Sequence, residues 1–238
     1  MAEDLPEKKK RTKDVDAFLS KVAVTPKRAM APGKRGRLMF AMDATASRQP
    51  TWDIAANIQG QMFIETAALG GLDIQLAFYR GFGEFRVGSW TDNEKELLRL
   101  MTSVTCLAGQ TQIGKVLQHA VNEAKRDRLN ALIFVGDCVE EDIDRLGVAA
   151  GEMGLLGVPA FIFHEGDDAM ARFAFEQIAT LSGGACMRFD ASSADVLREL
   201  LAAVAVFAAG GRRALEDMAK RDGGAVLKLT NQMRKSGQ

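Results

Sequence analysis

The sequence predicts an α/β fold, namely a doubly wound, Rossmann-like open sheet of about six strands, mostly parallel, with helices on both faces and one antiparallel edge strand. Three observations lead to this prediction. Strand-like and helix-like segments alternate from residue 37 to residue 208. Residues 38–42 form a continuous apolar run, which is typical of a strand buried on both faces. Only residues 80–83 separate the second strand from the third. Because a parallel pair needs a crossover of a dozen or more residues, these two strands must pair antiparallel.

The individual elements follow from the spacing of apolar residues. Pro50 suits the first turn of a helix, and apolar residues recur every fourth position over 54–62. Strands are expected at 72–79 and 84–90, where apolar and polar residues alternate. The remaining expected elements are helices at 92–104, 112–126, 142–155, 168–182 and 193–208, and strands at 131–136, 159–163 and 185–189.

Length and composition fit one folded domain with an extension at each end. The 238 residues are 47% hydrophobic and 26% charged, which is the balance of a globular protein. Residues 1–35 are expected to form a basic, flexible N-terminal extension, because this part of the chain is rich in Lys and Arg and poor in large apolar side chains. The alternating pattern places the domain at residues 36–208. Residues 209–238 are expected to form a partly helical C-terminal extension.

Charge and hydropathy argue against several classes of function. The 31 basic residues balance the 31 acidic ones, which disfavours a protein built around nucleic acid. The basic run 8–11 could be a nucleic-acid or localisation patch, but a solvated tail is the preferred interpretation. No signal-peptide pattern is visible, and the apolar run 200–209 is about half of the roughly 20 residues that span a bilayer. Three cysteines are too few for a disulfide framework and are expected to be reduced thiols. We therefore expect a cytoplasmic protein that binds neither nucleic acid nor membrane.

Oxygen-bearing side chains lie at one end of the predicted sheet. Asp43, Thr45 and Ser47 follow the first strand, Asp137 follows the fourth, and Thr111 lies in the loop before a helix. Ligands of doubly wound sheets bind beyond the carboxyl ends of the strands. Carboxylate and hydroxyl oxygens suit Mg²⁺, Mn²⁺ or Ca²⁺ and exclude a thiolate zinc site. The pattern therefore indicates a divalent-cation site, with Mg²⁺ as the first candidate.

This set resembles the metal-ion-dependent adhesion site of the von Willebrand factor A (VWA) family. The pattern D-x-[ST]-x-S after the first strand, a loop Thr and an Asp after the fourth strand carry the resemblance, which covers residues 36–208. It implies that the five residues named above hold the metal and that an acidic group of a partner protein completes an open coordination position. The sequence departs from the family at Thr45, where Ser is commoner, and after Asp137, where Cys-Val-Glu-Glu replaces a frequent Gly-rich turn. The second departure implies an acidic rim made by Glu140 and Glu141.

The same residues also allow structural explanations. Asp43 and Ser47 could cap the helix that begins near Pro50, and Thr111 could cap the helix at 112–126. The acidic residues 140–142 could favour the start of the following helix through its macrodipole. Asp137 is the hardest to explain in this way, since a carboxylate directly after a buried strand needs a cation or a helix N-terminus.

Two other functions remain as alternatives to a cation-dependent protein-binding module. One is a metal-dependent phosphohydrolase with Asp43 as nucleophile, but Thr45 occupies the position where such an enzyme needs a second Asp as general acid. The other is a structural scaffold with an unoccupied site. His119 and His164 lie far apart in the sequence, so we expect structural roles for both and no catalytic triad. We therefore expect a protein that is not an enzyme.

Overall fold

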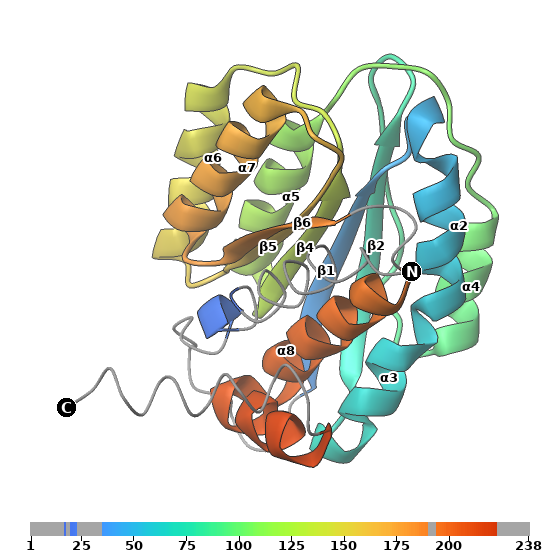
Figure 1. Cartoon of the computed structure of the whole chain (residues 1–238), viewed down its shortest axis with the longest axis vertical. Helices are drawn as coiled ribbons and strands as arrows, with labels where there is room; N and C mark the ends of the chain where they lie inside the picture. Colours follow the sequence, from blue (N-terminus) through green and yellow to red (C-terminus); the bar gives the residue numbers. More distant parts are fainter. Residues whose placement is uncertain (1–16, 18–19, 23–34, 190–193, 223–238) are drawn as a thin grey trace, which may run out of the picture.

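A six-stranded sheet with the order β3-β2-β1-β4-β5-β6 forms the centre of the molecule (Figure 1). The computed structural model describes residues 17, 20–22, 35–189 and 194–222. The strands are β1 (Gly36–Asp43), β2 (Leu72–Arg80), β3 (Glu84–Val87), β4 (Ala131–Gly136), β5 (Ala160–Glu165) and β6 (Ala185–Phe189). All neighbouring strands pair parallel except β2 and β3, which pair antiparallel at one edge. The predicted fold class is therefore confirmed.

Helices cover both faces of this sheet (Figure 1). One face carries α5 (Ile113–Arg126), α6 (Ile143–Leu155) and α7 (Ala169–Ser182); the other carries α2 (Gln49–Ile58), α3 (Gly60–Thr66), α4 (Glu94–Thr102) and α8 (Ala194–Asp222). Successive side chains of β1 point to opposite faces: Met39 and Ala41 lie in the core under α5, whereas Phe40 and Met42 lie in the core under α8. The apolar run at 38–42 is thus a strand buried on both sides, as predicted.

The third strand is shorter than the expected range 84–90. Its ladder with β2 ends at Val87. Beyond it the chain still bonds β2, through the Gly88 N–H to the Leu76 carbonyl and through the paired backbone hydrogen bonds of Ile74 and Thr91. Gly88 lies where the ladder ends and in close contact with Leu100 of α4, as expected of a glycine at the end of a strand.

The first predicted helix is divided in two. A 3₁₀ turn, η1 (Ala46–Arg48), precedes α2, and the chain leaves α2 at Gln59 before α3 begins at Gly60. A side chain at Gly60 would overlap the carboxylate of Glu94 at the start of α4. The break thus allows α4 to pack closely on this layer. A second 3₁₀ turn, η2 (Ala67–Leu69), follows α3.

The packed domain reaches beyond residues 36–208 at both ends. Val22 is fully buried and belongs to the same apolar core as the start of α8. At the other end, α8 continues through Gly211, which has a φ of 76° and marks a kink between two helical segments, and Leu215 beyond the kink is also in the core. Most of the range 1–35, and residues 223–238, lie outside the described residues. Across the part of the chain that is described, no helix has both the length and the apolar character needed to cross a membrane.

Burial of Val22 leads to a first prediction. Val22→Asp places an unpaired charge in the apolar core, which should cost about 3 kcal/mol or more of the free energy of unfolding. For a chain of this size that corresponds to a melting temperature lower by roughly 6–12 °C. Ala17→Asp, at an exposed helical position nearby, is the control and should melt as the wild type does. Equal melting of the two variants in a thermal scan would show that Val22 contributes nothing to the core.

Candidate metal site at the carboxyl end of the sheet

Three neighbouring parallel strands end in, or directly before, an acidic residue. Asp43 is the last residue of β1, Asp137 follows the last residue of β4, and Glu165 is the last residue of β5. Because β1 pairs with β4 and β4 with β5, these ends meet at one edge of the sheet. The topology thus brings three carboxylates to the place where doubly wound sheets bind their ligands.

Asp43 is held in place by the backbone but keeps one oxygen free. Asp43 is 1% exposed, and its Oδ1 accepts a hydrogen bond of 2.7 Å from the backbone N–H of Thr45. Oδ2 is buried and has no hydrogen-bond partner among the described residues. Burial raises the pKa of this carboxyl, against the lowering effect of the hydrogen bond from Thr45, and the nearby Asp137 raises it further. A buried carboxylate oxygen without a donor is the feature that a bound cation would satisfy.

Ser47 joins the end of β1 to the end of β4. Its hydroxyl donates to Oδ2 of Asp137 over 3.0 Å. Ser47 is exposed, and the side chain of Asp137 is 25% exposed, so the site opens to solvent on this side. Neither η1 nor α2 has a side-chain cap. Helix capping therefore does not account for Asp43 or Ser47.

Three residues beside this group, Arg48, Thr51 and Glu165, were not among the predicted site residues. Arg48 is 1% exposed, forms an ion pair with Glu165, and has its Nη1 3.8 Å from Oδ2 of Asp137. The hydroxyl of Thr51 donates a hydrogen bond to Oε2 of Glu165, the oxygen that also pairs with Arg48. Glu165 could have been predicted from the sequence, since it comes at the end of an apolar strand, as Asp43 and Asp137 do. No sequence pattern points to Arg48, because its burial depends on contacts between segments that are distant in the sequence.

Thr111 faces the loop after β4 instead of capping a helix. The N-cap position of α5 is Gln112, whose own side chain makes no capping hydrogen bond. The backbone N–H of Thr111 donates to Oε2 of Glu140 over 2.9 Å, and the Thr111 hydroxyl accepts from the Glu140 backbone N–H over 3.0 Å. This reciprocal pair places Thr111, which is 7% exposed, against the segment that begins with Asp137. The hydroxyl of Thr111 thus lies beside the loop that carries Asp137.

Glu140 and Glu141 have a different role from the one expected. Both oxygens of Glu141 accept 2.7 Å hydrogen bonds, from the backbone N–H groups of Ile113 and Gly114 in the first turn of α5. Of these acidic residues, Asp142 caps the helix that follows in the sequence, α6, because its Oδ1 accepts from the backbone N–H groups of Asp144 and Arg145. The macrodipole explanation is therefore right for Asp142, whereas Glu141 serves the N-terminus of a neighbouring helix. The expected acidic rim is made of carboxylates that already hold backbone amides.

The tip of the β2–β3 hairpin is fastened to the loop that carries Thr111. The backbone N–H of Gly81 donates to the carbonyl of Leu107, and the N–H of Gln110 donates to the carbonyl of Gly81. Gly81 has a φ of 57°, and a Cβ atom on Gly109 would overlap the Gly81 carbonyl. The backbone conformation thus favours glycine at position 81, and the contact between the hairpin and the loop requires glycine at position 109.

The histidines and cysteines contribute no obvious ligand. His164 is 1% exposed, packs its ring edge-to-face on Phe175, and has its pKa lowered by burial. A ring nitrogen of His119 lies 2.9 Å from Oε1 of Gln75, away from the strand ends. All three cysteines are free thiols. Among the described residues, no group of three or more His, Cys, Asp and Glu could hold a metal ion. A cation at this edge would depend on the hydroxyl oxygens as well as the two Asp carboxylates.

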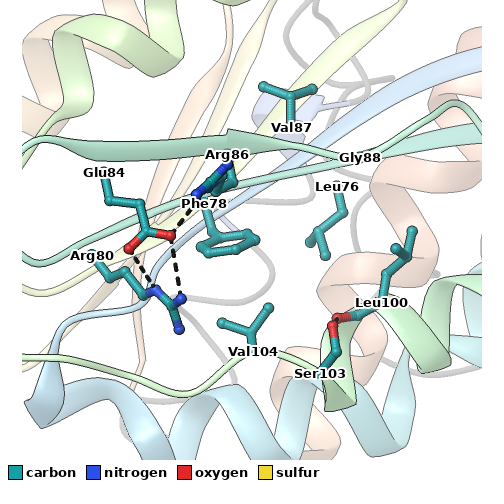
Figure 2. A pocket seen from close by; sticks show the side chains of 10 residues that line it. All are labelled: Leu76, Phe78, Arg80, Glu84, Arg86, Val87, Gly88, Leu100, Ser103 and Val104. Carbon is teal, nitrogen blue, oxygen red and sulfur yellow. Dashed lines mark hydrogen bonds and ion pairs between the residues drawn. The ribbon is translucent and has the colours of Figure 1, made fainter.

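A separate cavity of about 330 Å³ lies between β2, β3 and α4 (Figure 2). Its apolar wall includes Phe78 and Val104, and at one end Glu84 accepts hydrogen bonds from both Arg80 and Arg86. Arg80 also donates to the carbonyl of Thr105, which ties the end of β2 to the following loop. None of the five predicted site residues lines this cavity, so it is distinct from the candidate metal site.

The cap made by Glu141 leads to a second prediction. Glu141→Ala leaves two backbone N–H groups of α5 without acceptors and should lower the free energy of unfolding by about 1–2 kcal/mol. Chemical denaturation measures this change. Glu96→Ala removes a carboxylate whose partner is an exposed Arg99, and it should barely change stability. If both variants unfold at the same denaturant concentration, the carboxylate of Glu141 does not support α5.

Comparison with known proteins rests on solved structures, since no family model matches the sequence and no curated protein matches it. The VWA domain of SpRpn10 shares 14% identity, with a TM-score of 0.55 over 69% of this chain and 94% of that domain. A von Willebrand factor type A structure from Catenulispora acidiphila shares 16% identity, with a TM-score of 0.60 over 71% of this chain and 42% of that one. Proximal thread matrix protein 1 from the mussel byssus, with a zinc-occupied MIDAS motif, shares 15% identity, with a TM-score of 0.55 over 71% of this chain and 45% of that one.

These matches fit the observed topology. The chain spans less than half the length of the latter two structures. In each case the matched region covers about seven tenths of this chain. The sequence identities are too low to show more than a shared fold. Together with the sheet order and the single antiparallel edge strand, they show that this chain has the fold of a von Willebrand factor A domain.

Proposed function

We propose that this protein is a protein-binding module of the VWA type that recognises its partner through a bound divalent cation. The residues that would hold the cation are Asp43, Thr45, Ser47, Thr111 and Asp137. The observation that carries the proposal is the buried, unpartnered Oδ2 of Asp43 at the same sheet edge as Asp137. When bound, the cation would supply a coordination position for a carboxylate of the partner.

The donor chemistry supports a hard cation. The five residues offer carboxylate and hydroxyl oxygens, which suit Mg²⁺ or Mn²⁺, and Ca²⁺ less specifically. The mussel protein of similar fold holds zinc at its MIDAS motif, which supports a divalent ion without selecting one. Ser47 is exposed and Asp137 is partly exposed, so a partner can reach this edge from solvent.

The phosphohydrolase alternative has less support. Asp43 would have to attack a substrate, yet it is 1% exposed and one of its oxygens is occupied by the Thr45 N–H. The hydroxyl of Thr45 is a poor general acid compared with the carboxyl that such an enzyme needs. We therefore infer binding rather than turnover.

Cation binding should stabilise the fold. A ligand that binds only the folded state at one hundred times its Kd adds about 2.7 kcal/mol, which is a rise in melting temperature of roughly 5–11 °C for this chain length. We expect Mg²⁺ or Mn²⁺ to produce this rise in the wild type, and Asp43→Asn and Asp137→Asn to abolish it. Asp142→Asn is the matched control: Asn also caps helices, so the rise should be kept. An equal rise in Asp137→Asn and wild type would refute the site assignment.

Partner binding should depend on both the cation and the partner's carboxylate. Immobilised wild-type protein should retain its partner from lysate in Mg²⁺ and release it in a chelator, while Asp137→Asn should retain little in either buffer. Once mass spectrometry identifies the retained protein, replacing its contacting Asp or Glu by the amide should abolish binding of the purified pair. Glu140 and Glu141 are unsuitable for this test because they hold the Thr111 loop and α5. Full binding in the chelator would rule out a cation-bridged contact.

A further inference from the structure

Arg48 is a charged side chain enclosed by the candidate site. It is 1% exposed, and its Nε and Nη2 are buried without a hydrogen-bond partner among the described residues. Its Nη1 lies between Glu165, with which it forms an ion pair, and Asp137, whose Oδ2 is 3.8 Å away. The guanidinium brings one positive charge and five N–H donors to this place, and it has no acceptor.

Three carboxylates and one guanidinium meet at the ends of β1, β4 and β5. When ionised, Asp43, Asp137 and Glu165 carry three negative charges and Arg48 carries one positive charge, so these four side chains have a net negative charge. Replacing Arg48 by a neutral residue would make this net charge more negative by one unit, and replacing Glu165 by a neutral residue would make it less negative by one unit.

We propose that Arg48 is a resident cation, which holds Asp137 and Glu165 together in the cation-free protein and limits how tightly a divalent cation binds beside it. The second half of this statement rests on the proposed function, whereas the first half does not. Arg48 would act as a positioning residue through its two carboxylate neighbours, because nothing places it on the partner or on the cation itself.

The surroundings of Arg48 keep it from moving aside. It follows Ser47 directly and ends the 3₁₀ turn η1, so its backbone is fixed next to the site. Glu165 is fixed in turn by the hydroxyl of Thr51 on α2. A charge held in this way repels an incoming cation, while Glu165 compensates part of that repulsion. If the ion pair had a purely structural role, removal of Arg48 would not increase the affinity for a cation.

Melting in a chelator tests the resident cation without any metal. Arg48→Met leaves Asp137 and Glu165 facing each other, and Glu165→Gln leaves Arg48 without its main partner. Each should lower the melting temperature by about 10 °C, since removal of one member of a buried pair leaves an uncompensated charge. The double variant Arg48→Met with Glu165→Gln should recover most of the loss. Losses that simply add in the double variant would overturn the role of Arg48 as a counter-ion.

Affinity for Mn²⁺, measured by calorimetry, tests the consequence. Arg48→Met should bind Mn²⁺ roughly tenfold more tightly than the wild type, and Glu165→Gln roughly tenfold more weakly, as expected of one unit charge acting at short range. The double variant should return close to the wild-type affinity, and Arg48→Lys, which keeps the charge, should stay near it. A structural role would instead weaken binding in every variant, so weaker or unchanged binding by Arg48→Met overturns the inference.

The two failures can be told apart. If the wild type binds no Mn²⁺, the proposed function fails together with the limit on affinity, and the melting experiment alone decides whether Arg48 holds the two carboxylates. The wild type could instead bind Mn²⁺ while the affinities of the variants do not increase with the net negative charge of the site. In that case the proposed function stands and the inference about Arg48 is wrong.

Discussion

Parallel pairing of β1, β4 and β5 brings carboxylates to one edge of the sheet, where they repel one another, and the surrounding structure is arranged to hold that charge. Asp43 receives the backbone N–H of Thr45, and Asp137 receives the hydroxyl of Ser47. Arg48 lies between Asp137 and Glu165. These partners leave Oδ2 of Asp43 unsatisfied. The residual negative charge at a solvent-accessible edge is the physical reason to expect a cation there.

The acidic residues near this edge fall into two groups with opposite uses. Asp43 and Asp137 lie at the ends of the neighbouring strands β1 and β4, and Oδ2 of Asp43 has no hydrogen-bond partner among the described residues. Glu140 and Glu141 are satisfied by backbone amides, of Thr111 and of the first turn of α5 respectively. A negative charge next to a helix N-terminus is stabilised by the orphan amides and by the macrodipole, so this second group contributes to order more than to attraction of a ligand.

The sequence contains enough information for the fold class and for part of the candidate site. The continuous apolar runs and the four-residue hairpin loop predicted the parallel sheet and its antiparallel edge, because these are local patterns with few structural solutions. Asp43 and Asp137 stood out because each follows a buried run, and Glu165 could have been found by the same argument.

The remainder depends on contacts between distant segments. The amide partners of Glu141 lie 27 and 28 residues away, and Arg48 pairs with residues about 90 and 117 positions further along the chain. The close contact between Gly60, where α3 begins, and Glu94 of α4 likewise joins segments that are distant in the sequence. Periodicity within one segment carries no signal for such contacts, so these features become visible only once the chain is folded.

The β2–β3 hairpin contacts the loop that carries Thr111 through the backbones of the two segments. Gly81 at its tip and Gly109 in the Thr111 loop lie too close for any side chain on Gly109, and hydrogen bonds join the same segments. The two loops therefore form one mechanical unit, although 28 residues separate the two glycines in the sequence. A loop transplanted into this scaffold at either position would disturb the other, so grafting of a new binding specificity would have to replace both segments as a matched pair.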